Sequence, residues 1–175
     1  QDQLTEEQYE KADILENLNR YILDGGAGTG KSFLMIYDAN RFSSNGKSVG
    51  IVVPTKKLSD KIKEGLTKDI DCFALTDPIN FDKKYDIIYF DEGQDFMNNS
   101  GWSLLDQLVK GGVSEGVWRI FGDFQNQRSP NFEFDDEVKD LLLLATGTNN
   151  FISLKRNVRN TPQIVNYMEE ILDAR

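Results

Sequence analysis

The amino-acid sequence predicts an α/β domain in which helices flank both faces of a central, mostly parallel sheet. Short apolar runs bounded by Gly, Asn and Asp alternate with segments of helical periodicity, which is the rhythm of βαβ units. A glycine-rich loop lies directly between the first apolar run and a helical segment, and a later apolar run ends in two adjacent carboxylates. The alternation therefore favours a largely parallel sheet.

The elements follow from these patterns in chain order. A first helix is expected because Thr5 and Gln8 fit a capping box ahead of an amphipathic stretch. The apolar runs predict six strands, at residues 21–23, 49–53, 72–75, 85–90, 117–121 and 151–154. The helical patterns predict five further helices, at residues 31–42, 58–66, 102–109, 137–145 and 162–172.

Two of these helices show their buried side in the sequence. Leu58, Ile62 and Leu66 fall on one stripe of the helix expected at 58–66. The acidic residues 135–137 precede a stripe of Val138, Leu141 and Leu142, so they are interpreted as an N-terminal cap on an exposed face.

Length and composition restrict the kind of protein. The 175 residues, of which 39% are apolar, suit a single domain with a packed core. The chain carries 20 basic and 29 acidic side chains and a formal charge of −9. No apolar run approaches the roughly 18 residues that span a bilayer, and the acidic N-terminus lacks the layout of a signal peptide. We therefore expect a cytoplasmic protein without a membrane partner.

The absence of histidine limits the chemistry. Without histidine there is no Ser-His-Asp or Cys-His catalytic group, and the single cysteine, Cys72, forms neither an intramolecular disulfide nor a Cys/His zinc site. Cys72 is expected to be a small buried apolar residue. Any metal must therefore be a hard cation held by oxygen ligands.

Residues 25–32, GGAGTGKS, fit the phosphate-binding pattern G-x-x-x-x-G-K-[ST]. Glycines let successive N–H groups face inward, and the N-terminus of the following helix adds positive potential for phosphate oxygens. Lys31 is expected to reach the β and γ phosphates of a bound nucleotide, and Ser32 is expected to bind Mg²⁺. The alternative, a glycine-rich turn without a ligand, is disfavoured by the strand-loop-helix setting. The candidate nucleotide-binding residues are Gly26, Ala27, Gly28, Thr29, Gly30, Lys31 and Ser32.

A second polar group is expected opposite this loop. The apolar strand at 85–90 ends in Asp91 and Glu92. Asp91 can hold the Mg²⁺ shell, and Glu92 can orient and deprotonate an attacking water. A strand followed by two acids also occurs as a plain solvated turn, so this assignment depends on its combination with the phosphate loop.

Six segments in order carry a resemblance to a known family: LTEEQ, GGAGTGKS, VVPTKKL, DEGQDF, FGDFQNQ and LKRNVRNT. Together they resemble the first RecA-like domain of superfamily 1 DNA helicases, specifically the UvrD/Rep-like group. The resemblance covers about residues 4 to 165. It implies a RecA-like P-loop NTPase fold, with residues 1–175 forming one ATP-binding domain.

The resemblance also implies roles for single residues. Gln8 is similar to the glutamine that reads the adenine edge, which implies ATP as the nucleotide. The family's γ-phosphate-sensing glutamine falls on Asn126 here, so Gln127 is preferred for that role and Gln125 is the alternative. Arg159 resembles the arginine that points at the γ-phosphate, although the family's base-stacking tyrosine is Val158 in this chain.

Partners follow from the same resemblance. The region of Thr55 and Lys56 resembles a segment that contacts single-stranded DNA, although Thr55 is equally expected to do no more than cap a helix. The family carries a second RecA-like domain with a further arginine finger, and this chain has no such segment. Because of this absence and the acidic charge, we expect weak or absent DNA binding by the chain alone.

Two functions are compatible with these patterns. The first is the ATP–Mg²⁺-binding domain of a superfamily 1 helicase or translocase, which hydrolyses ATP to ADP and phosphate within a longer protein and slowly in isolation. The second is a regulatory module that binds ATP without translocation. Glu92 favours the enzyme, because a pure binding module needs no general base.

Overall fold

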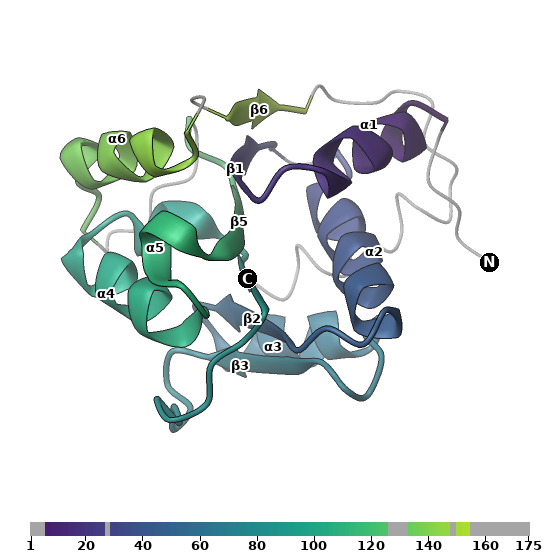
Figure 1. Ribbon diagram of the computed structural model, residues 1–175, viewed down its shortest axis with the longest axis horizontal. Helices are drawn as coiled ribbons and strands as arrows, with labels where there is room; N and C mark the ends of the chain where they lie inside the picture. Colours follow the sequence, from purple (N-terminus) through teal and green to yellow (C-terminus); the bar gives the residue numbers. More distant parts are fainter. Residues whose placement is uncertain (1–5, 27–28, 126–132, 148–149, 155–175) are drawn as a thin grey trace.

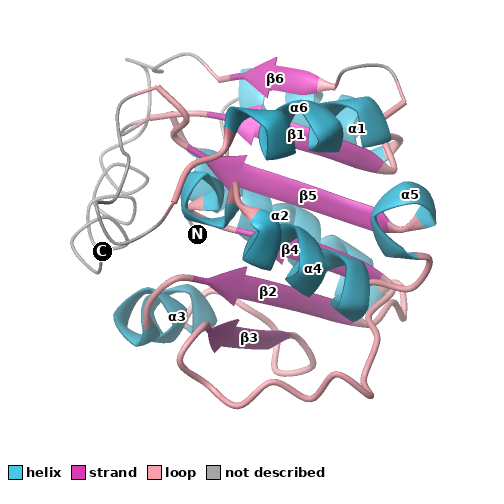
Figure 2. Cartoon of the chain, turned by 90° about the vertical axis from the view of Figure 1, so that its left-hand side faces the viewer, coloured by secondary structure: helices cyan, strands magenta, loops and turns pink. Residues whose placement is uncertain are grey.

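The computed structural model describes residues 6–26, 29–125, 133–147 and 150–154. Six strands in these ranges form one sheet in the order β3-β2-β4-β5-β1-β6, and every neighbouring pair is parallel (Figure 2). The strands are β1 (Arg20–Asp24), β2 (Val49–Val53), β3 (Asp71–Ala74), β4 (Ile87–Phe90), β5 (Val117–Gly122) and β6 (Phe151–Ser153).

Helices cover both faces of the sheet (Figure 1). Apolar side chains of α1 (Glu6–Glu16), α2 (Lys31–Ser44) and α3 (Lys56–Lys63) pack with one set of strand residues. Those of α4 (Asn99–Leu108), α5 (Gly112–Glu115) and α6 (Asp136–Ala145) pack with the alternate set. Because neighbouring residues of a strand point to opposite faces, the single sheet separates two apolar cores.

The expected fold class is confirmed: the chain forms a mostly parallel α/β sheet with helices on both faces. All six expected strands are present, although the pairing of β4 begins at Ile87 and Tyr85 forms only an isolated bridge to Val109. The helix expected at 162–172 and the capping residue Thr5 lie outside the described residues.

The structure corrects several helix boundaries. Two helices begin earlier than expected because a side chain caps each: Thr55 accepts a hydrogen bond from Leu58 N in α3, and Asn98 accepts one from Gly101 N in α4. The short helices η1 (Gly93–Phe96) and α5 were not expected.

Leu58 and Ile62 are buried as expected, but Leu66 is only partly buried and lies beyond the end of α3 at Lys63, so its place in the expected helical stripe is wrong. Cys72 is buried as expected, with 4% of its surface exposed. On α6, Val138 and Leu142 are buried, but Leu141 is 46% exposed, so its place in the expected buried stripe is wrong. In the described ranges, no helix has the length and apolar character needed to cross a membrane.

Candidate functional site

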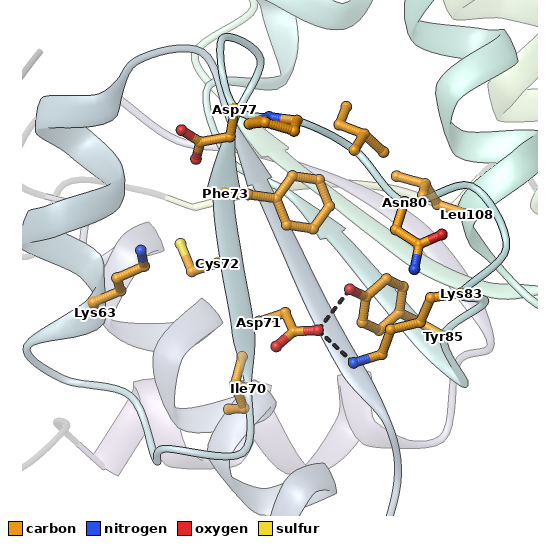
Figure 3. Close-up of a pocket in the computed structure, with 12 residues that line it drawn as sticks. Lys63, Ile70, Asp71, Cys72, Phe73, Asp77, Asn80, Lys83, Tyr85 and Leu108 are labelled. Atoms are coloured by element: carbon orange, nitrogen blue, oxygen red, sulfur yellow. Dashed lines mark hydrogen bonds and ion pairs between the residues drawn. The ribbon is translucent and has the colours of Figure 1, made fainter.

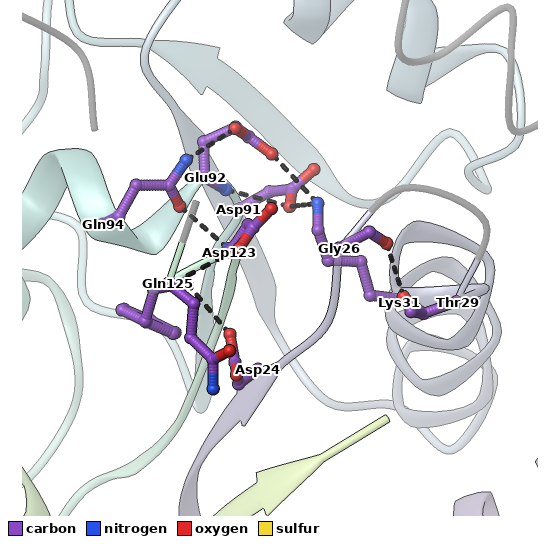
Figure 4. Close-up of polar contacts among 10 residues, drawn as sticks. Asp24, Gly26, Thr29, Lys31, Asp91, Glu92, Gln94, Asp123 and Gln125 are labelled. Atoms are coloured by element: carbon purple, nitrogen blue, oxygen red, sulfur yellow. Dashed lines mark hydrogen bonds and ion pairs between the residues drawn. The ribbon is translucent and has the colours of Figure 1, made fainter. Parts of the chain in front are cut away.

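Polar side chains gather where β1, β5 and β4 end side by side (Figure 4). Asp24 is the last residue of β1, while Asp91 and Asp123 follow β4 and β5 directly. The backbone N–H of Gly25 donates to Gly122 O at 2.9 Å, which fastens the start of the glycine-rich loop to β5. In parallel sheets this carboxyl edge is where ligands bind.

The described part of the glycine-rich loop is held by short contacts. Thr29 Oγ1 donates to Gly26 O at 2.7 Å. Gly30 has φ +83°, a conformation that side chains rarely adopt, and a Cβ there would lie 2.1 Å from Gln8 Nε2. Gln8, which the sequence predicts to read the adenine edge, is 4% exposed, and its side-chain amide lies beside Gly30 of the loop.

Lys31 lies at the centre of the site. Its side chain is 1% exposed, and its Nζ is 2.9 Å from Glu92 Oε1 and 3.8 Å from Asp91 Oδ1. Figure 4 shows the lysine of the loop pointing directly at the two acids that follow β4. The structure thus brings together three residues that the sequence analysis assigned to one site.

Ser32 and Asp91 fit a divalent cation. Both residues are fully buried, and in the described ranges neither Ser32 Oγ nor Asp91 Oδ2 has a hydrogen-bond partner. Buried oxygens without a partner are costly, and hydroxyl and carboxylate oxygens are the ligands that Mg²⁺ prefers.

These two oxygens would supply only part of a coordination shell. Across the part of the chain that the structure describes, no three His, Cys, Asp or Glu side chains are grouped so as to hold a metal ion by themselves. Mg²⁺ in proteins commonly takes its remaining ligands from water and substrate phosphates. The donor set therefore fits a cation that arrives together with a phosphate ligand.

Glu92 is held in an unusual backbone conformation. Its φ of 54° and ψ of 45° are left-handed, and in the described residues it is the only non-glycine with positive φ. The next residue, Gly93, passes so close to β5 that a Cβ would lie 2.2 Å from Ile120 Cγ2. Such strain is typical of functional sites, where packing holds a side chain in place.

Gln94 connects the acids to the end of β5. Its Nε2 donates to Glu92 Oε2 at 2.8 Å, and its Oε1 accepts from Asp123 N at 3.1 Å. Asp24 Oδ1 in turn accepts from Phe124 N at 2.9 Å. No role was predicted from the sequence for Gln94, Asp24 or Asp123. Gln94 and Asp123 stand inside the motifs DEGQDF and FGDFQNQ, which was the available signal.

The remaining predicted residues are not part of this cluster in the described structure. Ala27, Gly28, Gln127 and Arg159 lie outside the described residues, as does Val158. The alternative phosphate sensor Gln125 is described, and its side chain is exposed. Thr55 and Lys56 follow β2, where Thr55 caps α3 and Lys56 Nζ lies 3.7 Å from Asp60 Oδ1.

A separate cavity of about 410 Å³ lies beside the edge strand β3 (Figure 3). Tyr85 and Asp71 contribute to its lining, and the Tyr85 hydroxyl donates to Asp71 Oδ2 at 2.7 Å. None of its lining residues belongs to the cluster around Lys31.

One protein family matches more than half of the chain. The family described as "Type III restriction enzyme, res subunit" matches residues 1–102. No curated protein sequence matches the chain significantly.

Solved structures show the same fold. Pif1 from Bacteroides sp in complex with ADP-AlF4 superposes with a TM-score of 0.53 and 13% identity, covering 95% of this chain and 45% of that chain. A structure described as two coordinating Pif1 helicases at forked dsDNA gives a TM-score of 0.51 and 14% identity, covering 94% of this chain and 46% of that chain. At these identities the likeness concerns the fold, and it confirms the predicted RecA-like α/β domain. This chain spans less than half of either Pif1 chain.

Proposed function

Because the chain belongs to the family of type III restriction enzyme res subunits, we propose that it is the ATP-binding domain of a helicase or translocase. In this proposal the domain binds ATP with Mg²⁺ and hydrolyses it to ADP and phosphate within a longer protein. The finer assignment to superfamily 1, and to its UvrD/Rep-like group, rests on the motif order from LTEEQ to LKRNVRNT.

One observation carries the proposal. The buried ammonium of Lys31 meets Asp91 and Glu92 beside Ser32 Oγ, which is buried and has no hydrogen-bond partner in the described residues. A phosphate chain needs a cation and backbone N–H groups, and a hydrolytic site needs in addition a metal ligand and a general base. Lys31, Ser32, Asp91 and Glu92, the residues proposed for these tasks, lie at one edge of the sheet.

Each residue has a defined role in this proposal. Lys31 leaves Glu92 and pairs with the β and γ phosphates, while Ser32 and Asp91 hold the cation. When bound, Mg²⁺ polarises the phosphoryl oxygens. Glu92, released from Lys31 but still oriented by Gln94, accepts the proton of the attacking water.

Three further residues complete the proposed site. Gln8 reads the adenine edge, since its buried side chain already lies against Gly30. Arg159 and Gln127, with Gln125 as the alternative, contact the γ-phosphate. The roles of Arg159, Gln127 and Gln125 rest on the motif resemblance alone.

Hydrolysis by this chain alone is proposed to be slow. A second RecA-like domain of the longer protein would add an arginine finger, and such a finger is worth about 10³ to 10⁵ in rate. Single-stranded DNA is proposed to contact the region of Thr55 and Lys56, weakly for this chain because its formal charge is −9.

The acidic charge, which disfavours DNA binding, also suits a second function, a regulatory module that binds ATP without translocation. The two functions differ in their response to DNA. We expect single-stranded DNA to stimulate ATP hydrolysis when the chain is joined to its second RecA-like domain. Hydrolysis that is the same with and without DNA in that longer protein would favour the regulatory module.

The central test is the substitution Lys31→Ala. We expect it to weaken the binding of a nonhydrolysable ATP analogue with Mg²⁺ by about tenfold or more, because a charge-assisted hydrogen bond to phosphate is lost. Isothermal titration calorimetry measures this affinity directly.

Lys110→Ala is the matched control. Lys110 Nζ also lies 2.9 Å from a carboxylate oxygen, Asp86 Oδ1, but at the other end of the strands. We expect this variant to bind the analogue like the unaltered chain. Unchanged affinity in Lys31→Ala would disprove the phosphate-binding role of the loop.

A further inference from the structure

Beneath the candidate site, four polar side chains are buried in the apolar core between the sheet and α2. They come from four different elements, β1, α2, β4 and β5, and each is at most 2% exposed: Tyr21, Asp38, Tyr89 and Arg119. Burial of a charge in an apolar core is costly unless the charge is paired and hydrogen-bonded. Apolar packing alone therefore does not explain why these polar side chains are buried here.

Asp38 and Arg119 pair with each other and with the strands. Arg119 Nε lies 3.0 Å from Asp38 Oδ2, and the Tyr89 hydroxyl donates to the same oxygen at 2.5 Å. Arg119 Nη2 donates to Leu18 O at 2.9 Å, and its guanidinium carbon lies 5.1 Å from the centre of the Tyr21 ring. Asp38 thus connects α2 to β4 through Tyr89 and to β5 through Arg119.

The same aspartate reaches α1 through a second arginine. Arg41 Nη2 lies 3.1 Å from Asp38 Oδ1 and donates to Ala12 O at 3.2 Å. Arg41 Nη1 lies 3.3 Å from Glu16 Oε2. Asp38 therefore connects three elements that carry candidate ligand groups: α1 with Gln8, α2 with Lys31, and β4, which leads into Asp91.

The spacing of these residues aligns them with the site. On α2, Asp38 follows Lys31 by seven residues, about two helical turns, so both side chains leave the same side of the helix. On β4, Tyr89 precedes Asp91 by two residues, which corresponds to the same face of the strand. Helix and strand are therefore joined at two levels, by Lys31 with Asp91 and by Asp38 with Tyr89 below it.

We propose that Asp38, Tyr89 and Arg119 are positioning residues that fix the rotation of α2 about its axis and so set Lys31 and Ser32 against Asp91. The inference deepens the proposed function and rests on it. Apolar packing alone would tolerate small rotations of the helix, whereas a directed hydrogen bond to a buried carboxylate selects one orientation.

Stability alone is a weaker explanation of this network. Replacing a buried ion pair by apolar residues of similar volume is often neutral or stabilising. The Tyr89 hydroxyl donates to a carboxylate oxygen that is buried with it, so the hydrogen bond is shielded from water. A lasting directional bond suits a positioning role.

The substitution Tyr89→Phe tests the proposal, because it removes only the hydroxyl that donates to Asp38. We measure the affinity for a nonhydrolysable ATP analogue by calorimetry, once with Mg²⁺ and once with EDTA. We expect Tyr89→Phe to weaken binding with Mg²⁺ by about threefold to tenfold, the value of one hydrogen bond, and to reduce the gain in affinity that Mg²⁺ gives.

Tyr85→Phe is the matched control. Tyr85 also donates its hydroxyl to a carboxylate, Asp71 Oδ2, beside β3 (Figure 3), and is 5% exposed. The cavity that these two residues line contains no residue of the cluster around Lys31. We expect this variant to lower the melting temperature to a similar extent and to leave nucleotide affinity and its response to Mg²⁺ unchanged. A purely structural role for Tyr89 would make the two variants alike in affinity.

The outcomes separate the inference from the proposed function. If the unaltered chain does not bind the analogue, the proposed function is wrong. If it binds and Tyr89→Phe binds equally well with the same response to Mg²⁺, only the positioning role is wrong. If Tyr89→Phe does not fold, Arg119→Lys is measured in the same way, since it keeps the charge and loses the planar fork. Failure of both variants to fold would assign the network to overall stability and overturn the proposal.

Discussion

The ammonium of Lys31 and the carboxylate of Glu92 form a buried pair that the proposed chemistry must separate. At 2.9 Å the two groups neutralise each other in a site where both are at most 6% exposed. In the proposed chemistry a phosphate ligand replaces the carboxylate as the partner of Lys31, and Glu92 then becomes available as a base. The proposal therefore couples nucleotide binding and activation of the base through a single lysine.

This coupling leads to a prediction for Glu92→Gln. The amide keeps the shape of the side chain but cannot accept the proton of water, so we expect hydrolysis to slow by about 10² to 10⁴, the usual value of a general base. Nucleotide affinity should not fall, because Lys31 no longer has to leave a carboxylate. Single-turnover hydrolysis of labelled ATP, with the protein in excess, measures the rate.

Glu115→Gln serves as the control for that experiment, since it makes the same change on an exposed side chain of α5. It should behave like the unaltered chain. Equal rates for Glu92→Gln and Glu115→Gln would contradict the role of Glu92 as a base.

The sequence predicted part of this residue-scale arrangement. The meeting of Lys31 with Asp91 and Glu92 followed from a loop after one strand and an acidic pair after another, since parallel strands bring such ends together. The contacts of the unpredicted residues join neighbouring segments. Gln94 bonds the side chain of Glu92 and the backbone N–H of Asp123, and Asp24 accepts from the backbone N–H of Phe124. Such contacts depend on register and turn geometry, which residue spacing does not specify.

At the scale of elements, Asn98 joins three segments. Its Oδ1 accepts from Gly101 N at 2.8 Å and so caps α4, while its Nδ2 donates to Asp95 O at 3.1 Å and to Glu133 O at 3.0 Å. α4 therefore begins at Asn99, directly after the capping residue Asn98, and not at Trp102, the first apolar residue of the pattern.

We accordingly expect Asn98→Ala to lower the free energy of unfolding by about 1 to 2 kcal/mol, at the upper end of the range for helix caps because the other two bonds are also lost. Urea denaturation followed by circular dichroism measures the change. The adjacent exposed residue provides the control, and Asn99→Ala should change stability by less than about 0.5 kcal/mol. Equal losses in both variants would rule out the capping role.

The elements that the sequence analysis did not predict are the shortest ones. η1 and α5 each have four residues, about one helical turn, and a single turn cannot display a periodic apolar pattern. The six strands were predictable because most are buried on both faces and form continuous apolar runs, as in β2 and β4.

At the scale of the whole molecule, Asp86 ties together segments at the amino ends of the strands. Its Oδ2 accepts from Ser48 N at 2.8 Å and its Oδ1 lies 2.9 Å from Lys110 Nζ. The hydrogen bond from Ser48 and the contact with Lys110 hold the pKa of Asp86 below its ordinary value of 3.8.

The sign of the resulting pH dependence follows from that direction. A carboxyl with a lowered pKa in the folded state contributes its full stabilisation above pH 3.8, and the contribution is lost as the pH falls through the lower folded-state value. We expect Asp86→Asn to reduce the fall in the free energy of unfolding between pH 5 and pH 2.5, measured by urea denaturation at each pH. Parallel pH profiles for the two proteins would contradict this expectation.

The overall architecture was predictable in class but not in detail. Alternating strand and helix patterns were sufficient for a parallel sheet covered on both faces. The strand order β3-β2-β4-β5-β1-β6 could not be predicted from these patterns, because it depends on which strands, distant in the sequence, pair with each other. The family match covers residues 1–102, and the likeness to the Pif1 structure with ADP-AlF4, of which this chain spans 45%, concerns the fold.

The edge strand β3 also affects how the molecule behaves among copies of itself. An open strand offers a row of amide and carbonyl groups on which another polypeptide can add, the first step toward fibrous assembly. Here Asp77 Oδ2 accepts from Ala74 N at 2.9 Å, and Asp77 N donates back to Ala74 O at 3.0 Å. This reciprocal pair occupies backbone groups at one end of a strand that is only four residues long, and a short, partly blocked edge is less open to the addition of another strand.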